Sequence, residues 1–262
     1  IIGSGKLFGI CLPENFRQPF CAKNPSEFWR RWHITLGAWF KAYIFYPVSV
    51  SGLVKKWNQY GRKHCGKHIT RLVTSAIALF PVWVANGVWH GAQWNYIFYG
   101  MYYFVLIMLG IAVEPVRDHI LEACHIDPET KIWRTIQIAK TWVIIVVGEL
   151  FFRANGLKAG WYMFCSMIKN FDVGQLTDGT LYTLGLERAD YLAVIVGCLI
   201  VGVIVHCFLF TKDCQRISVQ KKMGELAVPV RWGLYYALVI GILIFAAYGD
   251  GYQIQDLIYA GF

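Results

Sequence analysis

The sequence predicts an all-α, multi-pass transmembrane protein with additional interfacial or re-entrant helices. Hydrophobic residues fill 56% of the 262 positions and charged residues only 16%, whereas an average soluble domain has about 45–50% and about 25%. Much of the excess is gathered into stretches that approach the length of about 20 residues needed to cross a bilayer. The expected spans are Leu72–Ala92, Trp94–Val113, Trp142–Phe152 with the residues before it, Tyr191–Phe210 and Trp232–Tyr248.

The first 33 residues are expected to be mostly irregular, because prolines and glycines recur in them. Asn24-Pro25-Ser26-Glu27 has the pattern of a helix start, since proline and acidic residues are favoured in a first turn. A helix from Pro25 is expected to continue through Phe40. Basic residues flank this segment and Lys41 lies within it, so it is expected to lie in the interface or to re-enter the membrane.

The net charge of +9 is concentrated between the apolar stretches. The segments 55–71 and 211–231 are rich in Lys and Arg, and the positive-inside rule therefore places both loops in the cytoplasm. By alternation, the loop at 114–134 is cytoplasmic, the loop at 153–190 is external and the C-terminus is outside. This distribution does not favour a nucleic-acid partner, which would need a basic patch on one surface.

The first candidate site is Asn86-Gly87-Val88-Trp89-His90-Gly91, at the end of an apolar stretch that contains Pro81. Proline and glycine loosen a membrane helix, and polar groups freed there need protein or water partners. An imidazole beside such a break is suited to act as a general base near neutral pH. A histidine that simply caps a helix end would give the same pattern.

Two further places carry ionisable groups. In Phe28-Trp29-Arg30-Arg31-Trp32-His33, the arginines suit a phosphate or carboxylate, although an interfacial anchor of aromatic and basic residues would look the same. Glu149 and Arg153 stand at positions i and i+4, which favours a structural ion pair on a helix.

Several familiar chemistries have no pattern in this sequence. It has no glycine-rich nucleotide loop, no Gly-x-Ser-x-Gly elbow and no set of Cys and His at metal-binding spacing. No metal site is therefore expected.

Two histidine motifs resemble the membrane-bound O-acyltransferase (MBOAT) family. They are Phe28–Leu36, followed by Trp39-Phe40 and Tyr43, and Gly87–Ala92, followed by Trp94-Asn95 and Tyr99-Gly100. Similarity extends upstream to Leu12–Phe16 and downstream to Phe151–Ala154, and it is strongest to the bacterial branch of alginate O-acetylation and teichoic-acid D-alanylation. Lys41-Ala42-Tyr43 and Pro47-Val48-Ser49 depart from the alginate-type pattern, so the choice between acetyl and D-alanyl stays open.

The resemblance implies roles for individual residues. His90 would be the catalytic base that deprotonates an acceptor hydroxyl, and His33 would orient the acceptor or stabilise the oxyanion. Substrate contacts are expected from Trp89, Asn86, Arg30, Arg31 and Trp32. No tightly bound cofactor is expected; the donor would be an acyl thioester, either acyl-CoA or a phosphopantetheinyl carrier protein.

The resemblance also implies a setting for the chain. Residues 1–262 would form a single membrane domain, the C-terminal part of a partial MBOAT fold whose N-terminal helices are missing. The protein would lie in a bacterial plasma membrane, with an acyl carrier protein on the cytoplasmic side and an extracytoplasmic SGNH-type acyltransferase as partners. The alternative function is a multi-pass transporter or channel with intramembrane histidines in a proton or substrate path.

Overall fold

The computed structural model describes residues 2–176, 178–180, 188–209 and 223–245, and every regular element in these ranges is a helix. The all-α prediction is confirmed. The chain divides into two compact units, Ile1–Phe171 and Asp172–Phe262, and the expectation of one membrane domain over 1–262 stays a prediction. The second unit contains the 3₁₀ turn η3 (Val173–Leu176) and the helices α11 (Arg188–Leu209) and α13 (Val228–Phe245).

Three helices of the first unit are long and apolar enough to span a membrane: α6 (Gly66–His90), α7 (Trp94–Ala112) and α9 (Lys131–Arg153). They coincide with the first three expected spans. The other two expected spans fall on α11 and α13, whose described apolar stretches, Asp190–Ile200 and Val228–Ile244, are shorter. Residues 210 and 246–248 of those predicted spans lie outside the described residues.

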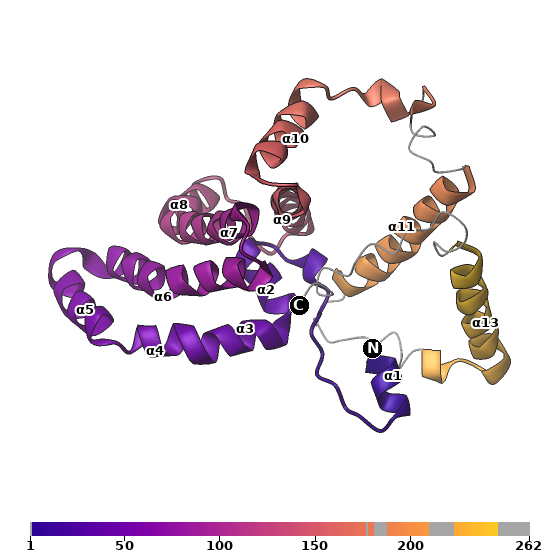
Figure 1. Cartoon of the computed structure of the whole chain (residues 1–262), viewed down its shortest axis with the longest axis horizontal. Helices are drawn as coiled ribbons and strands as arrows, with labels where there is room; N and C mark the ends of the chain where they lie inside the picture. Colours follow the sequence, from indigo (N-terminus) through magenta and orange to yellow (C-terminus); the bar gives the residue numbers. More distant parts are fainter. Residues whose placement is uncertain (1, 177, 181–187, 210–222, 246–262) are drawn as a thin grey trace. The chain divides into compact units, whose positions relative to one another are not determined.

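Helices α6 and α7 form an antiparallel hairpin (Figure 1). Glycines bring the two backbones together: a Cβ atom at Gly100 would clash with the carbonyl oxygen of Trp83, and one at Gly87 would lie 2.7 Å from that of Tyr96. Small residues allow such close approach of membrane helices, whose association gains little from the hydrophobic effect. The sequence suggested a backbone break before His90, which is wrong: α6 is continuous through Pro81 and Gly87, and the chain turns only at Gly91, where φ is +145°.

Helix α9 packs against α7 and completes the core of this unit. Buried Asn95, at the start of α7, donates from Nδ2 to the carbonyl oxygens of Phe152 and Ala154, each at 3.2 Å. The core cluster gathers Trp83, Tyr99, Tyr103, Ile107 and Phe152. The aromatic residues of three helices therefore meet near the His90 end of α6.

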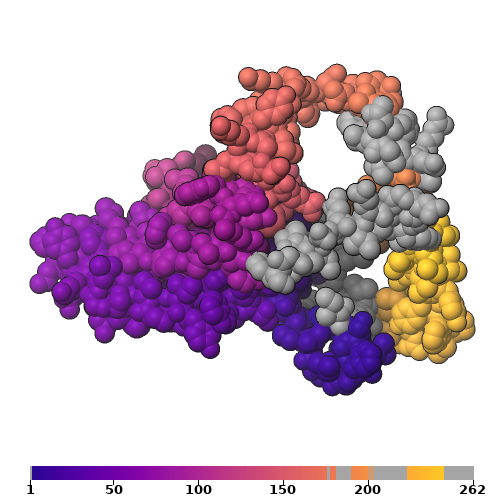
Figure 2. Space-filling model, viewed as in Figure 1, coloured from indigo at the N-terminus to yellow at the C-terminus, as the bar shows by residue number. Residues whose placement is uncertain are grey.

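The segment after His33 lies alongside α6 (Figure 1). It consists of α3 (Ile34–Phe40), the π-helical turn η2 (Lys41–Phe45) and α4 (Tyr46–Ser49), and both η2 and α4 contact α6. Helix α5 (Gly52–His64) then leads back to the start of α6. Figure 2 shows these elements, purple to magenta, as one continuous mass of side chains. An interfacial or re-entrant location for this segment stays a prediction.

The expected continuous helix from Pro25 to Phe40 is interrupted. Asn24 caps α2 (Pro25–Arg31) as predicted, with its Oδ1 accepting from the Glu27 N–H at 2.8 Å, but Trp32 is extended and His33 is left-handed, with φ +50°. The irregular segment around Asn15–Arg17 stabilises this break, because its backbone forms hydrogen bonds with residues on both sides of it. Arg17 N–H donates to Arg31 O at 2.9 Å, and Ile34 N–H donates to Asn15 O at 3.0 Å.

Three predicted loops contain helices. The basic segment 55–71 lies mostly on α5 and the first turns of α6, the segment 114–134 holds α8 (Glu114–Ala123), and the segment 153–190 holds α10 (Leu157–Lys169). These helices were missed because their mixed polar and apolar composition does not produce a long apolar run. The remaining elements are α1 (Ile2–Leu7) and the 3₁₀ turn η1 (Pro19–Cys21).

Candidate active site

His33 and His90, far apart in the sequence, both contact the indole ring of Trp89. The His33 ring meets it edge to face at 5.6 Å between centroids, and the His90 ring does so at 4.7 Å. His33 occupies the break between α2 and α3, while His90 is the last residue of α6. The fold thus brings the two predicted histidines into one site.

Both histidines are partly buried, and among the described residues neither Nδ1 atom has a hydrogen-bond partner. Burial lowers the pKa of His33 from its ordinary value, because the imidazolium form loses hydration. A neutral imidazole can accept a proton at one nitrogen and donate from the other. Each histidine therefore has a buried Nδ1 atom whose hydrogen-bonding capacity no described residue satisfies.

Aromatic rings surround His90 on its other sides. Phe152 lies 4.9 Å away and Tyr99 6.0 Å away, both edge to face, while Tyr96 is tilted at 6.3 Å. These rings come from α7 and α9 and fix the orientation of the imidazole by packing. The environment around His90 is accordingly apolar and protected from water.

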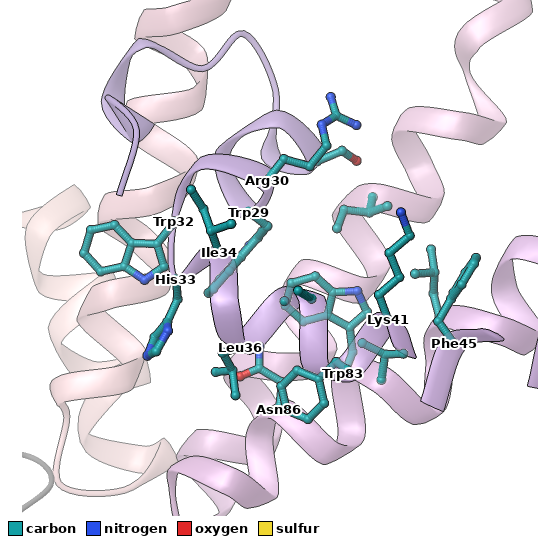
Figure 3. A pocket seen from close by; sticks show the side chains of 17 residues that line it. Trp29, Arg30, Trp32, His33, Ile34, Leu36, Lys41, Phe45, Trp83 and Asn86 are labelled. Carbon is teal, nitrogen blue, oxygen red and sulfur yellow. The ribbon is translucent and has the colours of Figure 1, made fainter. Parts of the chain in front are cut away.

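A cavity of about 450 Å³ adjoins the histidine pair (Figure 3). His33 and Asn86 are among its lining residues, and the Asn86 side chain is buried with no hydrogen-bond partner for Oδ1 among the described residues. On α6 the lining runs from Leu79 to Asn86, one turn before His90. His90 and Trp89 are not themselves among the lining residues. A ligand in this cavity would therefore contact His33 and Asn86 directly, whereas His90 lies outside the lining, one turn further along α6.

The two predicted arginines have different surroundings. Arg30 lines the cavity, as do Trp32 and Lys41, and in Figure 3 the charged ends of Arg30 and Lys41 point away from Asn86. Arg31 is absent from the lining and its Nη2 donates to Glu27 Oε1 at 2.5 Å. Burial by itself would raise the pKa of the Glu27 carboxyl. The hydrogen bonds from Arg31 and from the Lys23 backbone N–H have the opposite effect and dominate, so that pKa is lowered. Within the described chain, Arg31 has a structural partner and Arg30 faces the cavity.

Two further polar side chains, Asn15 and Glu149, have partners that the sequence did not predict. Asn15 holds the start of α3 after His33, accepting at Oδ1 from Thr35 N at 2.9 Å and from Thr35 Oγ1 at 2.6 Å. The sequence favoured an ion pair of Glu149 with Arg153, whereas the structure gives Glu149 a hydrogen bond from the Tyr99 hydroxyl at 3.2 Å. Only the polar character of Glu149 in an apolar helix could have signalled this role.

Comparisons with known proteins relate the chain to bacterial acyltransferases. No protein-family model matches it. It is 27% identical over 226 residues to a probable alginate O-acetylase of Pseudomonas aeruginosa, and the matched region is 86% of this chain and 36% of that relative. It is 38% identical over 106 residues to a teichoic acid D-alanyltransferase of Bacillus subtilis, and this match covers 40% of this chain and 24% of that relative.

A peptidoglycan O-acetyltransferase of Helicobacter pylori is a third relative, 28% identical over 214 residues, with 81% of this chain and 34% of the relative covered. The chain spans about a third of the length of the alginate and peptidoglycan relatives. These relatives, together with the apolar helices α6, α7 and α9, identify a membrane protein. The chain is therefore similar to bacterial acyltransferases of cell-surface polymers, in keeping with the resemblance of its two histidine motifs to the membrane-bound O-acyltransferase family.

Proposed function

We propose that the complete protein is an O-acyltransferase of a bacterial plasma membrane, crossing it several times. It would transfer an acetyl or D-alanyl group from a thioester to hydroxyl groups of a cell-surface polymer or of its carrier. The observation that carries this proposal is the meeting of His33 and His90 at Trp89, beside a cavity lined by His33 and Asn86. The names of the relatives reported above favour acyl transfer over the alternative of a transporter or channel.

In this reaction His90 moves a proton from the acceptor hydroxyl to the leaving sulfur. Its neutral imidazole takes the proton of the acceptor hydroxyl while the hydroxyl oxygen attacks the thioester carbonyl carbon. The C–S bond then breaks, the thiolate leaves and the proton returns from His90 to the sulfur, giving an ester and a thiol. No redox change occurs and no metal is required by this balance.

We propose that His33 and Asn86 stabilise the carbonyl oxygen. Both line the cavity, and Asn86 can donate from Nδ2 and His33 from a ring nitrogen. Donors aimed at a developing oxyanion in a water-poor site lower the activation barrier by about 3–4 kcal/mol each. Trp89 holds His33 and His90 in their relative orientation.

The cavity suits the arm of an acyl thioester. Its volume falls within the range of about 300–1,000 Å³ that is typical of small-molecule sites, and most of its lining is apolar. Arg30, with Lys41, offers positive charge for the phosphate groups of coenzyme A or of a carrier protein's phosphopantetheine. We propose the carrier protein as a cytoplasmic partner and an SGNH-type acyltransferase as an extracytoplasmic one.

The test replaces His90 with Ala in the complete protein, expressed in its own bacterium after deletion of the native gene. Cell-wall polymers are treated with mild alkali, and the released acetate and D-alanine are quantified. We expect loss of one of the two esters with an unchanged amount of protein in the membrane fraction, and the lost ester identifies the acyl group. Ester levels that stay normal in this variant would refute His90 as the base.

A further inference from the structure

Helix α9 presents a carboxyl group toward the His90 end of the core. Glu149 and Phe152 are three residues apart and therefore share one face of α9. Phe152 packs on His90, and Glu149 Oε1 accepts a hydrogen bond from the Tyr99 hydroxyl at 3.2 Å. The Glu149 side chain is partly buried in a helix that is apolar enough to span a membrane.

Tyr99 connects this carboxyl group to the candidate base. Its side chain is 4% exposed, and its ring stands edge to face against the His90 ring at 6.0 Å. Trp29, Tyr103 and Phe152 pack around the same ring at 4.9 to 6.1 Å. Tyr99 is thus held in one orientation, with its ring on His90 and its hydroxyl on Glu149.

A carboxyl group at this depth carries a cost that calls for an explanation. Ionisable groups in membrane helices are expensive and mark functional sites by default. Arg153, one turn further along α9, is exposed and interacts electrostatically with the Glu149 carboxyl group, while the hydrogen bond to that group comes from Tyr99 of α7, and Tyr103 of α7 also lies against it. Glu149 therefore contacts the tyrosines that pack beside the histidine site.

We propose that Tyr99 and Glu149 are positioning residues for His90, an inference that rests on the proposed function. Through Tyr99, the Glu149 carboxylate orients the imidazole and favours the imidazolium that forms when His90 takes the acceptor's proton. The pair plays the part of the buried acid that orients the histidine in hydrolase triads, with a tyrosine ring and hydroxyl between the acid and the base.

The test compares conservative variants of the complete protein by the rate at which alkali-labile ester appears on the cell-wall polymer. Glu149→Gln keeps size and an acceptor oxygen but removes the charge, and Tyr99→Phe keeps the ring but removes the hydroxyl. Each is expected to lower the rate roughly 10- to 100-fold, the range seen when a group that orients a catalytic ligand is lost. The double variant should be no slower than the slower single variant, because the two groups act as a unit.

A matched control lies on the same pair of helices. The Tyr102 hydroxyl donates to the Ile144 carbonyl oxygen at 2.8 Å, so Tyr102→Phe also removes a hydroxyl contact from α7 to α9 but should leave the rate unchanged. Glu149→Asp separates charge from packing: a positioning carboxylate predicts more activity for Asp than for Gln, while a packing role predicts the reverse. Membrane protein levels are measured for every variant.

The outcomes separate this inference from the proposed function. If His90→Ala removes the ester while Glu149→Gln or Tyr99→Phe keeps the parent rate, the positioning role is wrong and the acyltransferase stands. Equal losses in Tyr99→Phe and Tyr102→Phe, or greater activity of the Gln than of the Asp variant, also overturn it. If His90→Ala keeps the ester, the proposed function itself fails.

Discussion

His33 adopts a left-handed backbone conformation that few residues other than glycine, asparagine and aspartate tolerate. A residue held in this region costs about 1–3 kcal/mol, which the surrounding hydrogen bonds from Asn15 and Arg17 must offset. His33→Asn should therefore keep the fold and part of the ester formation, because Asn accepts this conformation and retains a donor and an acceptor. His33→Ala should lose nearly all activity. Alkali-labile ester and membrane protein level check both, and equal activity of the two variants would contradict a polar role for position 33.

The lowered pKa of His33 predicts how the stability of the folded protein changes with pH. The folded protein holds fewer protons at this site than the unfolded chain does, so its contribution to stability is present above the unfolded pKa of about 6.5 and is lost as the pH falls through that value toward the lower folded pKa. Thermal unfolding in detergent from pH 7.5 to 5.5 should show a steeper loss for the parent than for His33→Asn. An identical slope in the two proteins would show that His33 carries no such linkage.

The pairing of α6 with α7 depends on the absence of a side chain at Gly100. A Cβ atom there would meet the Trp83 carbonyl oxygen, a backbone atom that cannot rotate away. Gly100→Ala should destabilise the protein by about 1–3 kcal/mol, as overpacked cores do, and should disturb Trp83 and His90 beyond it on the same helix. Gly110→Ala is the control, since no atom lies within 4 Å of its added Cβ and helix propensity alone favours Ala by about 1 kcal/mol. A lower thermal midpoint for Gly100→Ala than for Gly110→Ala is expected.

The sequence predicts those elements that depend on local pattern and misses those set by tertiary partners. The helix start at Asn24 and the spans on α6 and α7 follow from capping and hydrophobicity. The break at His33 does not, because it is stabilised by hydrogen bonds with the Asn15–Arg17 segment. In the same way Glu149 suits an ion pair with Arg153 on an isolated helix, but packing of α9 on α7 offers it the Tyr99 hydroxyl. The histidine pair was predicted from motifs, whereas its meeting at Trp89 needed the fold.

In the first unit as a whole, polar and aromatic contacts lie at two levels, one near each end of the spanning helices α6, α7 and α9. Near one end, His68 lies 3.3 Å from the Ala112 carbonyl oxygen and Arg71 pairs with Glu114. At the other end, His90 packs on Phe152, and Asn95 bonds the last turn of α9. The basic segment 55–71 belongs to the first level and the histidine pair to the second. The positive-inside rule therefore predicts that the histidines lie toward the external side, with the cavity on the part of α6 that leads from them toward the cytoplasm.

This arrangement predicts which side of the membrane each end faces. Cys65, between α5 and α6, and Cys124, at the end of α8, lie at the end of the spanning helices that is predicted to be cytoplasmic. Lys169 ends α10, which follows the end of α9 that is predicted to be external. In spheroplasts that lack an outer barrier, a membrane-impermeant maleimide should modify a Lys169→Cys variant and spare Cys65 and Cys124 until the cells are lysed. Mass spectrometry of the purified protein identifies the modified sites. Labelling of Cys65 and Cys124 before lysis, with Lys169→Cys protected, would invert the orientation and put the histidine pair on the donor's side of the membrane. An acceptor polymer from outside could then reach His90 only through the cavity, and the thioester arm would need another route.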